Sequence, residues 1–194
     1  YLKEIKEIIK NSTFTYVRQK KMLGLGHAIL TGSTLIGDEA FAVVLADDLC
    51  DCDGKGVISQ LVEVYEQYKC SVVAIEEVPM SQTSKYGIIA GNPIDNSNNI
   101  YQVTEMIEKP NVEDAPSNMA IIGRYILTPD IFNILKNIKP GQNGEMQITD
   151  ALNIQAKKGK VIAYKFTGKR FDCGSVKGYI EANNFFANKK GLFN

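Results

Sequence analysis

Two segments that resemble buried strands, with an amphipathic segment between them, constrain the fold of this chain more than any other feature. Ala40–Leu45 is continuously apolar and Ser71–Val78 is rich in aliphatic residues, which is typical of strands buried on both faces of a sheet. Gly56–Tyr68 lies between them and places Val57, Leu61, Tyr65 and Tyr68 on one helical face. This order predicts an α/β fold, a Rossmann-like, mostly parallel (mixed) sheet flanked by helices.

The remaining segments extend this pattern through the rest of the chain. Thr128-Pro129 is expected to begin a helix, with Thr128 as its cap. No linker-like segment interrupts the pattern, so we expect residues 1–194 to form a single domain. The other expected elements are helices at residues 2–10, Leu25–Leu35, Gln147–Lys157 and Ser175–Asn188, and strands at Thr13–Arg18, Gly87–Ala90, Ile100–Glu108, Ala120–Leu127 and Val161–Phe166.

Charge and cysteine content exclude several classes of protein. The chain contains 22 Lys and Arg and 22 Asp and Glu residues, so its net charge favours neither a nucleic-acid nor a membrane partner. No apolar run approaches the roughly 20 residues that a membrane-spanning helix needs. Cys50, Cys52, Cys70 and Cys173 are scattered, which favours free thiols in a reducing cytoplasm over a disulfide framework.

Three aspartates stand where a ligand site is expected. Asp47 and Asp48 follow the apolar segment Ala40–Leu45, and ligands of open α/β sheets bind beyond the carboxyl ends of the strands. Asp172 follows another expected strand and precedes the last helix. Carboxylates in such positions can hold a hard cation such as Mg²⁺. The alternatives are a solvated loop or a helix cap, and Asp172 could cap the helix that follows it.

Glu108 and Lys109 place an acid beside a base at the end of a further strand. A carboxylate accepts hydrogen bonds from sugar hydroxyl groups, and Lys presents a point charge to phosphate. The alternative is an exposed ion pair that contributes little. Gly87 begins a strand and is interpreted first as a turn glycine.

The segment Gly24-Leu25-Gly26-His27 lies at an expected loop-to-helix connection. Glycine allows a ligand to approach the backbone, and a helix start favours anions or hydrogen-bond acceptors. The segment is not the dinucleotide fingerprint, because position 29 is Ile rather than Gly. His27 is interpreted as structural.

The order of these motifs is more specific than any one of them. From Thr13 onward, the chain resembles the bacterial UTP–glucose-1-phosphate uridylyltransferase family, whose members are also called UDP-glucose pyrophosphorylases. The motifs that carry the resemblance are Arg18-Gln19, Gly24-Leu25-Gly26-His27-Ala28, Leu45-Ala46-Asp47-Asp48, Lys85-Tyr86-Gly87, Glu108-Lys109-Pro110, Ser117-Asn118-Met119-Ala120, Gly123-Arg124-Tyr125, Gly144-Glu145-Met146-Gln147-Ile148-Thr149-Asp150 and Lys169-Arg170-Phe171-Asp172-Cys173-Gly174.

The resemblance implies roles for the residues at matching positions. Asp47 and Asp172 would hold Mg²⁺, and Lys109 would hold the phosphate of glucose 1-phosphate; these three are the implied catalytic residues. The implied substrate-binding residues are Gln19 and Gly24 at the uracil, and Gly87, Glu108, Ala120 and Ile121 at the glucose. The implied reaction is Mg²⁺-dependent in-line transfer that forms UDP-glucose and pyrophosphate from UTP and glucose 1-phosphate, in a homodimer or homotetramer.

Two departures from the family pattern bear on these expectations. Ala46 stands where many members carry Pro. The family's Gly-rich loop, G-x-G-T-R-x-x-P-x-T-K, has no match, and Leu2, Ile5 and Ile9 already show helical spacing. We therefore expect the chain to be incomplete at its N-terminus and inactive in this form. The alternatives are a sibling enzyme that uses dTTP or another sugar 1-phosphate, and a non-catalytic sugar-nucleotide-binding subunit of the same fold.

Overall fold

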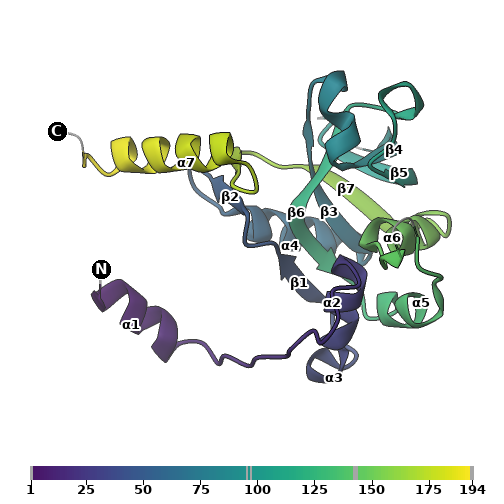
Figure 1. The fold of residues 1–194 in the computed structure, drawn as a ribbon, viewed down its shortest axis with the longest axis horizontal. Helices are drawn as coiled ribbons and strands as arrows, with labels where there is room; N and C mark the ends of the chain where they lie inside the picture. The colour runs from purple at the N-terminus through teal and green to yellow at the C-terminus, as the bar shows by residue number, and fades with distance from the viewer. Residues whose placement is uncertain (1, 95, 97, 142–143, 193–194) are drawn as a thin grey trace.

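A six-stranded mixed sheet forms the centre of the protein (Figure 1). The computed structural model describes residues 2–94, 96, 98–141 and 144–192. The strand order is β1-β6-β3-β7-β5-β4, with a further pairing between β6 and β4. The strands are β1 (Phe41–Val44), β3 (Ser71–Glu77), β4 (Gly87–Pro93), β5 (Ile100–Glu108), β6 (Met119–Leu127) and β7 (Val161–Lys165). A separate two-stranded antiparallel sheet contains β2 (Asp48–Asp51) and β8 (Lys169–Asp172).

The sheet is mixed and flanked by helices, as expected, but fewer of its strands pair in parallel than the sequence indicated. Among the described residues only β3 and β7 pair in parallel. Strand β6 lies antiparallel between β1 and β3, although β1 and β3 themselves run in the same direction. Apolar runs report burial on both faces of a sheet and not the direction of the neighbouring strand, so the sequence pattern could not show this.

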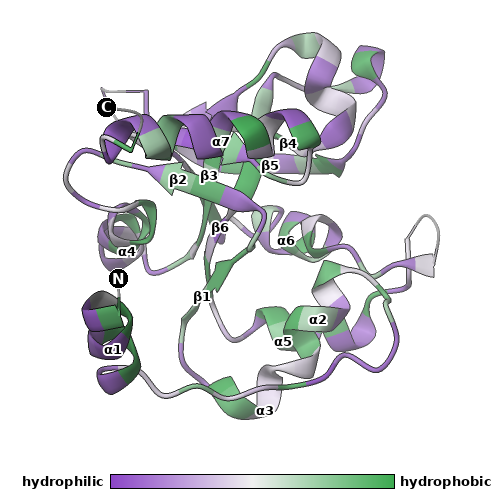
Figure 2. Ribbon diagram, turned by 60° about the vertical axis from the view of Figure 1, so that its left-hand side comes forward, coloured by the Kyte–Doolittle hydropathy of each residue, from purple (hydrophilic) through white to green (hydrophobic). Residues whose placement is uncertain are grey.

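Helices cover both faces of the sheet and enclose two apolar clusters. Figure 2 shows α4 (Val57–Tyr68) on one side, and α2 (Leu25–Thr31), α5 (Ile131–Asn137) and α6 (Ile148–Ala156) on the other. Alternate residues of β3 enter opposite clusters: Val72 packs with the α4 side and Val73 with the other. This period of two is the geometry of a strand, so one short apolar segment supplies both halves of the core. The other helical elements are α1 (Leu2–Lys10), α3 (Ser33–Ile36), α7 (Val176–Lys189), and the short 3₁₀ helices η1 (Met80–Lys85) and η2 (Val112–Asp114).

Several element predictions need correction at the N-terminal side. The strand predicted at Thr13–Arg18 is wrong, because these residues are exposed and pair with no described strand. The helix expected at Leu25–Leu35 is interrupted at Gly32, which separates α2 from α3. Strand β1 is not buried on both faces: its residues alternate, and Val44 is 55% exposed. Within the described residues β1 stands at the end of the strand order beside β6, and its side chains at Ala42 and Val44, on one face, are exposed.

Other predictions are confirmed with small shifts. Strand β5 has the predicted bounds, and α4, β3, α6 and β7 begin or end within one residue of prediction. Helix α5 begins at Ile131 with Asp130 rather than Thr128 at its N-cap; the Thr128 hydroxyl instead donates to Asp130 Oδ1 at 2.6 Å. All four cysteines are free thiols. Within the part of the chain that the structure describes, no helix is both long and apolar enough to span a bilayer.

Candidate functional site

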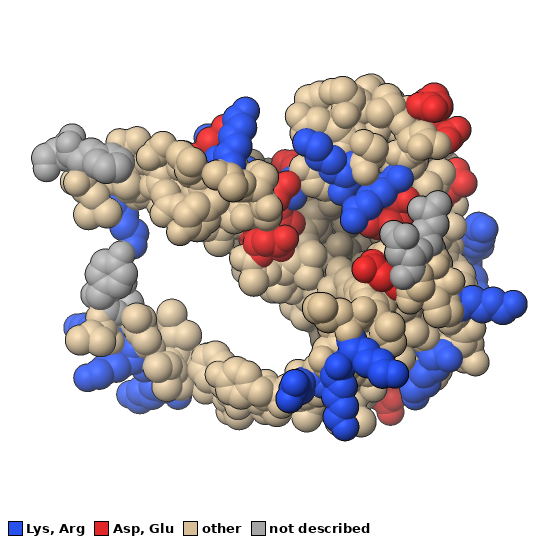
Figure 3. Space-filling model, viewed as in Figure 1, with Lys and Arg blue, Asp and Glu red and all other residues tan. Residues whose placement is uncertain are grey.

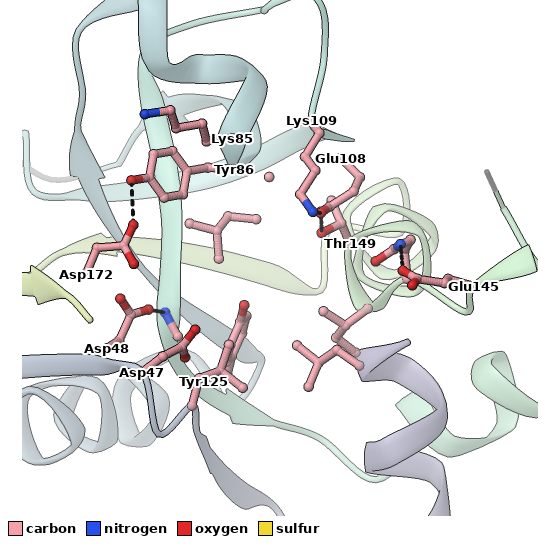
Figure 4. Close-up of a pocket in the computed structure, with 17 residues that line it drawn as sticks. Asp47, Asp48, Lys85, Tyr86, Glu108, Lys109, Tyr125, Glu145, Thr149 and Asp172 are labelled. Carbon is pink, nitrogen blue, oxygen red and sulfur yellow. Dashed lines mark hydrogen bonds and ion pairs between the residues drawn. The ribbon is translucent and has the colours of Figure 1, made fainter. Parts of the chain in front are cut away.

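A cavity of about 360 Å³ opens beside the carboxyl end of β1, between the two-stranded sheet and the start of α6 (Figure 4). Figure 3 shows acidic side chains around a hollow in this face of the molecule. Leu45, Gly123 and Tyr125 form part of its wall, and burial raises the pKa of the Tyr125 hydroxyl. The charged lining residues are Asp47, Asp48, Lys85, Glu108, Lys109, Glu145 and Asp172.

Asp47 and Asp172 converge at one end of this cavity. Strand pairing places Asp48 opposite Asp172, and the backbone N–H of Cys173 donates to the carbonyl of Asp47 at 2.8 Å. A Cβ added to Gly174 would lie 3.1 Å from Asp172 Oδ1 and 3.3 Å from Asp47 Oδ2. Both carboxylates therefore face the same small volume, although they lie 125 positions apart in the sequence.

The donor chemistry at this end fits a magnesium ion. Mg²⁺ in nucleotide-dependent enzymes is held by one or two carboxylates, and water and substrate phosphate complete its coordination. Among the residues that the structure describes, no group of three or more His, Cys, Asp or Glu side chains is arranged to hold a metal by itself. The remaining ligands of a cation held by Asp47 and Asp172 would then be water and phosphate oxygens of a bound nucleotide.

Asp48 has a structural role that the sequence did not indicate. Its side chain is buried, where it accepts a hydrogen bond from the Gly123 backbone N–H at 2.7 Å and forms an ion pair with Arg170. Gly123 allows this approach, because a Cβ there would lie 2.7 Å from Asp48 Oδ2 and 2.6 Å from the Leu45 Cβ. Neither the helix-cap nor the solvated-loop interpretation holds for Asp48.

Asp172 is held by its neighbours rather than acting as a helix cap. Ser175 is the N-cap of α7, and its hydroxyl accepts from the Gly178 N–H. Asp172 Oδ2 accepts a hydrogen bond from the Tyr86 hydroxyl at 3.1 Å and lies 3.7 Å from Arg170 Nη2. Burial raises the pKa of Tyr86 further above neutral pH, where its hydroxyl is protonated and donates this hydrogen bond.

Glu108 and Lys109 lie at the other end of the cavity, at the end of β5. The Thr149 hydroxyl donates to Glu108 Oε2 at 2.6 Å, which holds this carboxylate beside Gly87, its partner in the β4–β5 ladder. Lys109 Nζ is 3.9 Å from Glu108 Oε1, and the Lys109 side chain is 60% exposed. This long contact leaves the ammonium available to an anion. Ile121 lines the same end of the cavity.

The remaining candidate residues lie beside the cavity rather than on its wall. Gln19 Nε2 donates to the carbonyl of Gly24 at 3.2 Å and lies 2.9 Å from His27 Nδ1, which supports a structural interpretation of His27. Gly24 has a φ of 90° and immediately precedes Leu25, a lining residue. Ala120 is fully buried within β6, so only its neighbour Ile121 reaches the cavity with its side chain.

Sequence reasoning assigned no role to three residues that hold this site together, Tyr86, Thr149 and Arg170. All three stand within the quoted motifs, which is the one signal that could have identified them. Their partners are 86, 41 and 122 positions away, for the contacts with Asp172, Glu108 and Asp48. Spacing along the chain carries no information about contacts of this kind.

Comparison with known proteins places this geometry in a family. A family model described as nucleotidyl transferase matches residues 1–189. A UTP–glucose-1-phosphate uridylyltransferase from Pseudomonas aeruginosa is 61% identical over 186 residues, which are 95% of this chain and 66% of that relative. The chain thus spans slightly less than two thirds of the length of that relative.

Solved structures show the same likeness. The structure of a UDP-glucose pyrophosphorylase complexed with UDP-glucose superposes with a TM-score of 0.93 at 58% identity, covering 97% of this chain and 71% of the other. A UTP-bound UDP-glucose pyrophosphorylase from Acinetobacter baumannii superposes with a TM-score of 0.80 at 30% identity, covering 97% of this chain and 67% of the other. With a family model that matches nearly its whole length, the chain belongs to the nucleotidyl transferase family.

Proposed function

We propose that the protein acts as a UTP–glucose-1-phosphate uridylyltransferase, which forms UDP-glucose and pyrophosphate from UTP and glucose 1-phosphate. The observation that carries the proposal is the arrangement of one cavity: Asp47 and Asp172 converge at one end, while Glu108 and Lys109 line the other. One end suits a cation and phosphate, and the other suits a sugar phosphate. The names of the similar proteins, including structures with UDP-glucose or UTP bound, support the same substrates.

In this reaction an oxygen of the sugar phosphate attacks the α-phosphorus of UTP. A new P–O bond forms as the bond to pyrophosphate breaks, and the nucleophile is already anionic, so no strong general base is needed. The obstacle is the approach of two polyanions, which makes positioning and charge stabilisation the main contributions. Mg²⁺, when held by Asp47 and Asp172, supplies charge neutralisation at phosphate oxygens. Lys109 offsets the charge of the sugar phosphate, and Glu108 orients the hexose through its hydroxyl groups.

The proposal is tested by measuring product formation with the full-length gene product. Glucose 1-phosphate, Mg²⁺ and equal concentrations of UTP and dTTP are supplied together, and both nucleotide sugars are quantified. The competition is needed because uracil and thymine share the edge proposed to face Gln19. UDP-glucose should predominate, and a predominance of dTDP-glucose would favour the sibling enzyme. Binding without turnover would favour a non-catalytic subunit. The protein is further proposed to act in the cytoplasm as a homodimer or homotetramer, and light scattering on the same protein measures this oligomeric state.

Replacing Glu108 with Ala is expected to raise the KM for glucose 1-phosphate by about 10-fold or more. The change removes a charged hydrogen-bond acceptor, which typically contributes about 1.5–3 kcal/mol, and leaves the Thr149 hydroxyl without its partner. Steady-state kinetics with varied glucose 1-phosphate measures the effect. Glu105→Ala, at an exposed position of the same strand, is the matched control. An unchanged KM and kcat in Glu108→Ala would remove the sugar assignment.

Replacing Gly87 with Ala is expected to raise the same KM by about 10-fold, because tight contacts of this kind cost roughly 1–3 kcal/mol. The added Cβ would lie 3.0 Å from Thr149 Oγ1 and 3.2 Å from Glu108 Oε2, so it would push on the group proposed to bind the sugar. Gly56→Ala is the control, since a Cβ there meets no atom within 4 Å. Equal KM values for the two variants would show that Gly87 does not shape the sugar end.

A further inference from the structure

The two carboxylate oxygens of Asp172 have different surroundings. Oδ1 accepts a hydrogen bond from the Gly174 backbone N–H at 3.1 Å and faces the volume that it shares with Asp47. Oδ2 points the other way, toward the Tyr86 hydroxyl at 3.1 Å and Arg170 Nη2 at 3.7 Å (Figure 4 shows the Tyr86 contact). A carboxylate held on one oxygen presents the other in a defined direction.

Arg170 is itself fixed by side chains on its other sides. Its guanidinium is 7% exposed and donates to Asp48 through Nε and to Glu76 Oε1 through Nη1, the latter at 2.6 Å. It also lies 5.0 Å from the centre of the Tyr86 ring, within the range of a cation–π contact. Because an Arg guanidinium stays protonated in proteins, the charge beside Asp172 is permanent.

Tyr86 also connects the two ends of the cavity through its backbone. Its carbonyl accepts a hydrogen bond from the Lys109 N–H at 3.0 Å, and its own N–H donates to the carbonyl of Thr83 at 3.2 Å. Lys109 needs this support, because its φ of 45° lies in the left-handed region that non-glycine residues rarely adopt. One residue thus joins the carboxylate end of the cavity to the backbone of the proposed phosphate-binding Lys109.

We propose that Tyr86 and Arg170 are positioning residues that hold Oδ2 of Asp172, so that Oδ1 is directed toward Asp47 to receive a divalent cation. The inference rests on the proposed magnesium site and deepens it. Residues that hydrogen-bond to a metal-coordinating side chain fix the orientation of that side chain. Removing such a residue typically weakens metal affinity by about 10- to 100-fold.

The test is direct binding of Mn²⁺, which carboxylate ligands hold as they hold Mg²⁺, to the full-length protein in the presence of UDP-glucose. The electron paramagnetic resonance signal of the free ion gives the Kd without any turnover. Tyr86→Phe keeps the ring beside Arg170 and removes only the hydroxyl, and we expect it to raise the Kd by about 10-fold. Arg170→Lys keeps the charge, but a lysine cannot contact Asp48, Glu76 and Asp172 together. We therefore expect this variant to raise the Kd for Mn²⁺ as well.

Tyr101→Phe is the matched control, because its hydroxyl donates to the Asn98 carbonyl at 2.8 Å, away from the cavity. A Tyr86→Phe protein with the wild-type Kd, while Asp172→Asn abolishes binding, would overturn the positioning role and leave the magnesium site standing. If Asp172→Asn also bound Mn²⁺ as wild type does, the magnesium site and this inference would both be overturned. Thermal unfolding of Tyr86→Phe, expected to match that of Tyr101→Phe, shows whether the loss is local.

Discussion

Replacing Asp47 with Asn is expected to lower the rate of UDP-glucose formation by about 100- to 1,000-fold, the loss seen when one preorganised electrostatic group is removed from an active site. The substitution keeps the size of the side chain and removes its negative charge. Asp47 Oδ2 and Asp172 Oδ1 face one volume, so either loss leaves a single carboxylate to hold the cation. Initial rates over a range of Mg²⁺ concentrations, at saturating UTP and glucose 1-phosphate, measure the effect on the full-length protein.

The shape of the magnesium dependence separates a metal role from a general loss of structure. A weakened site should recover part of its rate at high Mg²⁺, whereas a misfolded protein should not. Asp38→Asn, at an exposed position before β1, is the control and should behave as wild type. Because Asp47 and Asp172 are proposed to hold one ion, the double variant should be little worse than either single one. Near-normal turnover in Asp47→Asn would remove the metal role.

Replacing Arg170 with Met is expected to lower the free energy of unfolding by about 3–5 kcal/mol, the cost of leaving a buried charge without its partner. Asp48 is 5% exposed, and within the described residues its carboxylate would keep only the hydrogen bond from the Gly123 backbone N–H. Glu76 would lose its contact as well. The long apolar Met side chain fills similar space, so the effect reports the loss of the charge and its contacts rather than a cavity. Equilibrium unfolding of the wild type and of Arg170→Met in urea measures this difference in the free energy of unfolding.

A surface pair supplies the comparison. Lys55 and Glu63 form an ion pair with side chains that are 67% and 58% exposed. Exposed pairs of this kind contribute at most about 1 kcal/mol, so Lys55→Met should change stability little. Similar losses in Lys55→Met and Arg170→Met would show that the buried network around Asp48 does not stabilise the fold.

The sequence by itself determined the elements whose signal is local. The helical period of apolar residues identified α4, and the β-branched runs identified β3 and β5. The motif Glu108-Lys109 showed an acid beside a base at the end of β5, where either an ion pair or a ligand site was possible, and the resemblance to the family assigned both residues to the ligand site that they line. A strand also needs a neighbouring strand to pair with, which local composition does not report. The β-branched and aromatic residues of Thr13–Arg18 therefore led to a wrong strand prediction.

The tertiary structure alone decided how the carboxylates meet and what holds them. Strands β2 and β8 are short and polar, so no periodicity marks them, yet their pairing sets Asp48 opposite Asp172. The contacts of Arg170 with Asp48 and of Tyr86 with Asp172 join residues 122 and 86 positions apart. Hydrogen bonds and ion pairs act over a few ångströms in space, and only the folded chain brings such distant residues within that range.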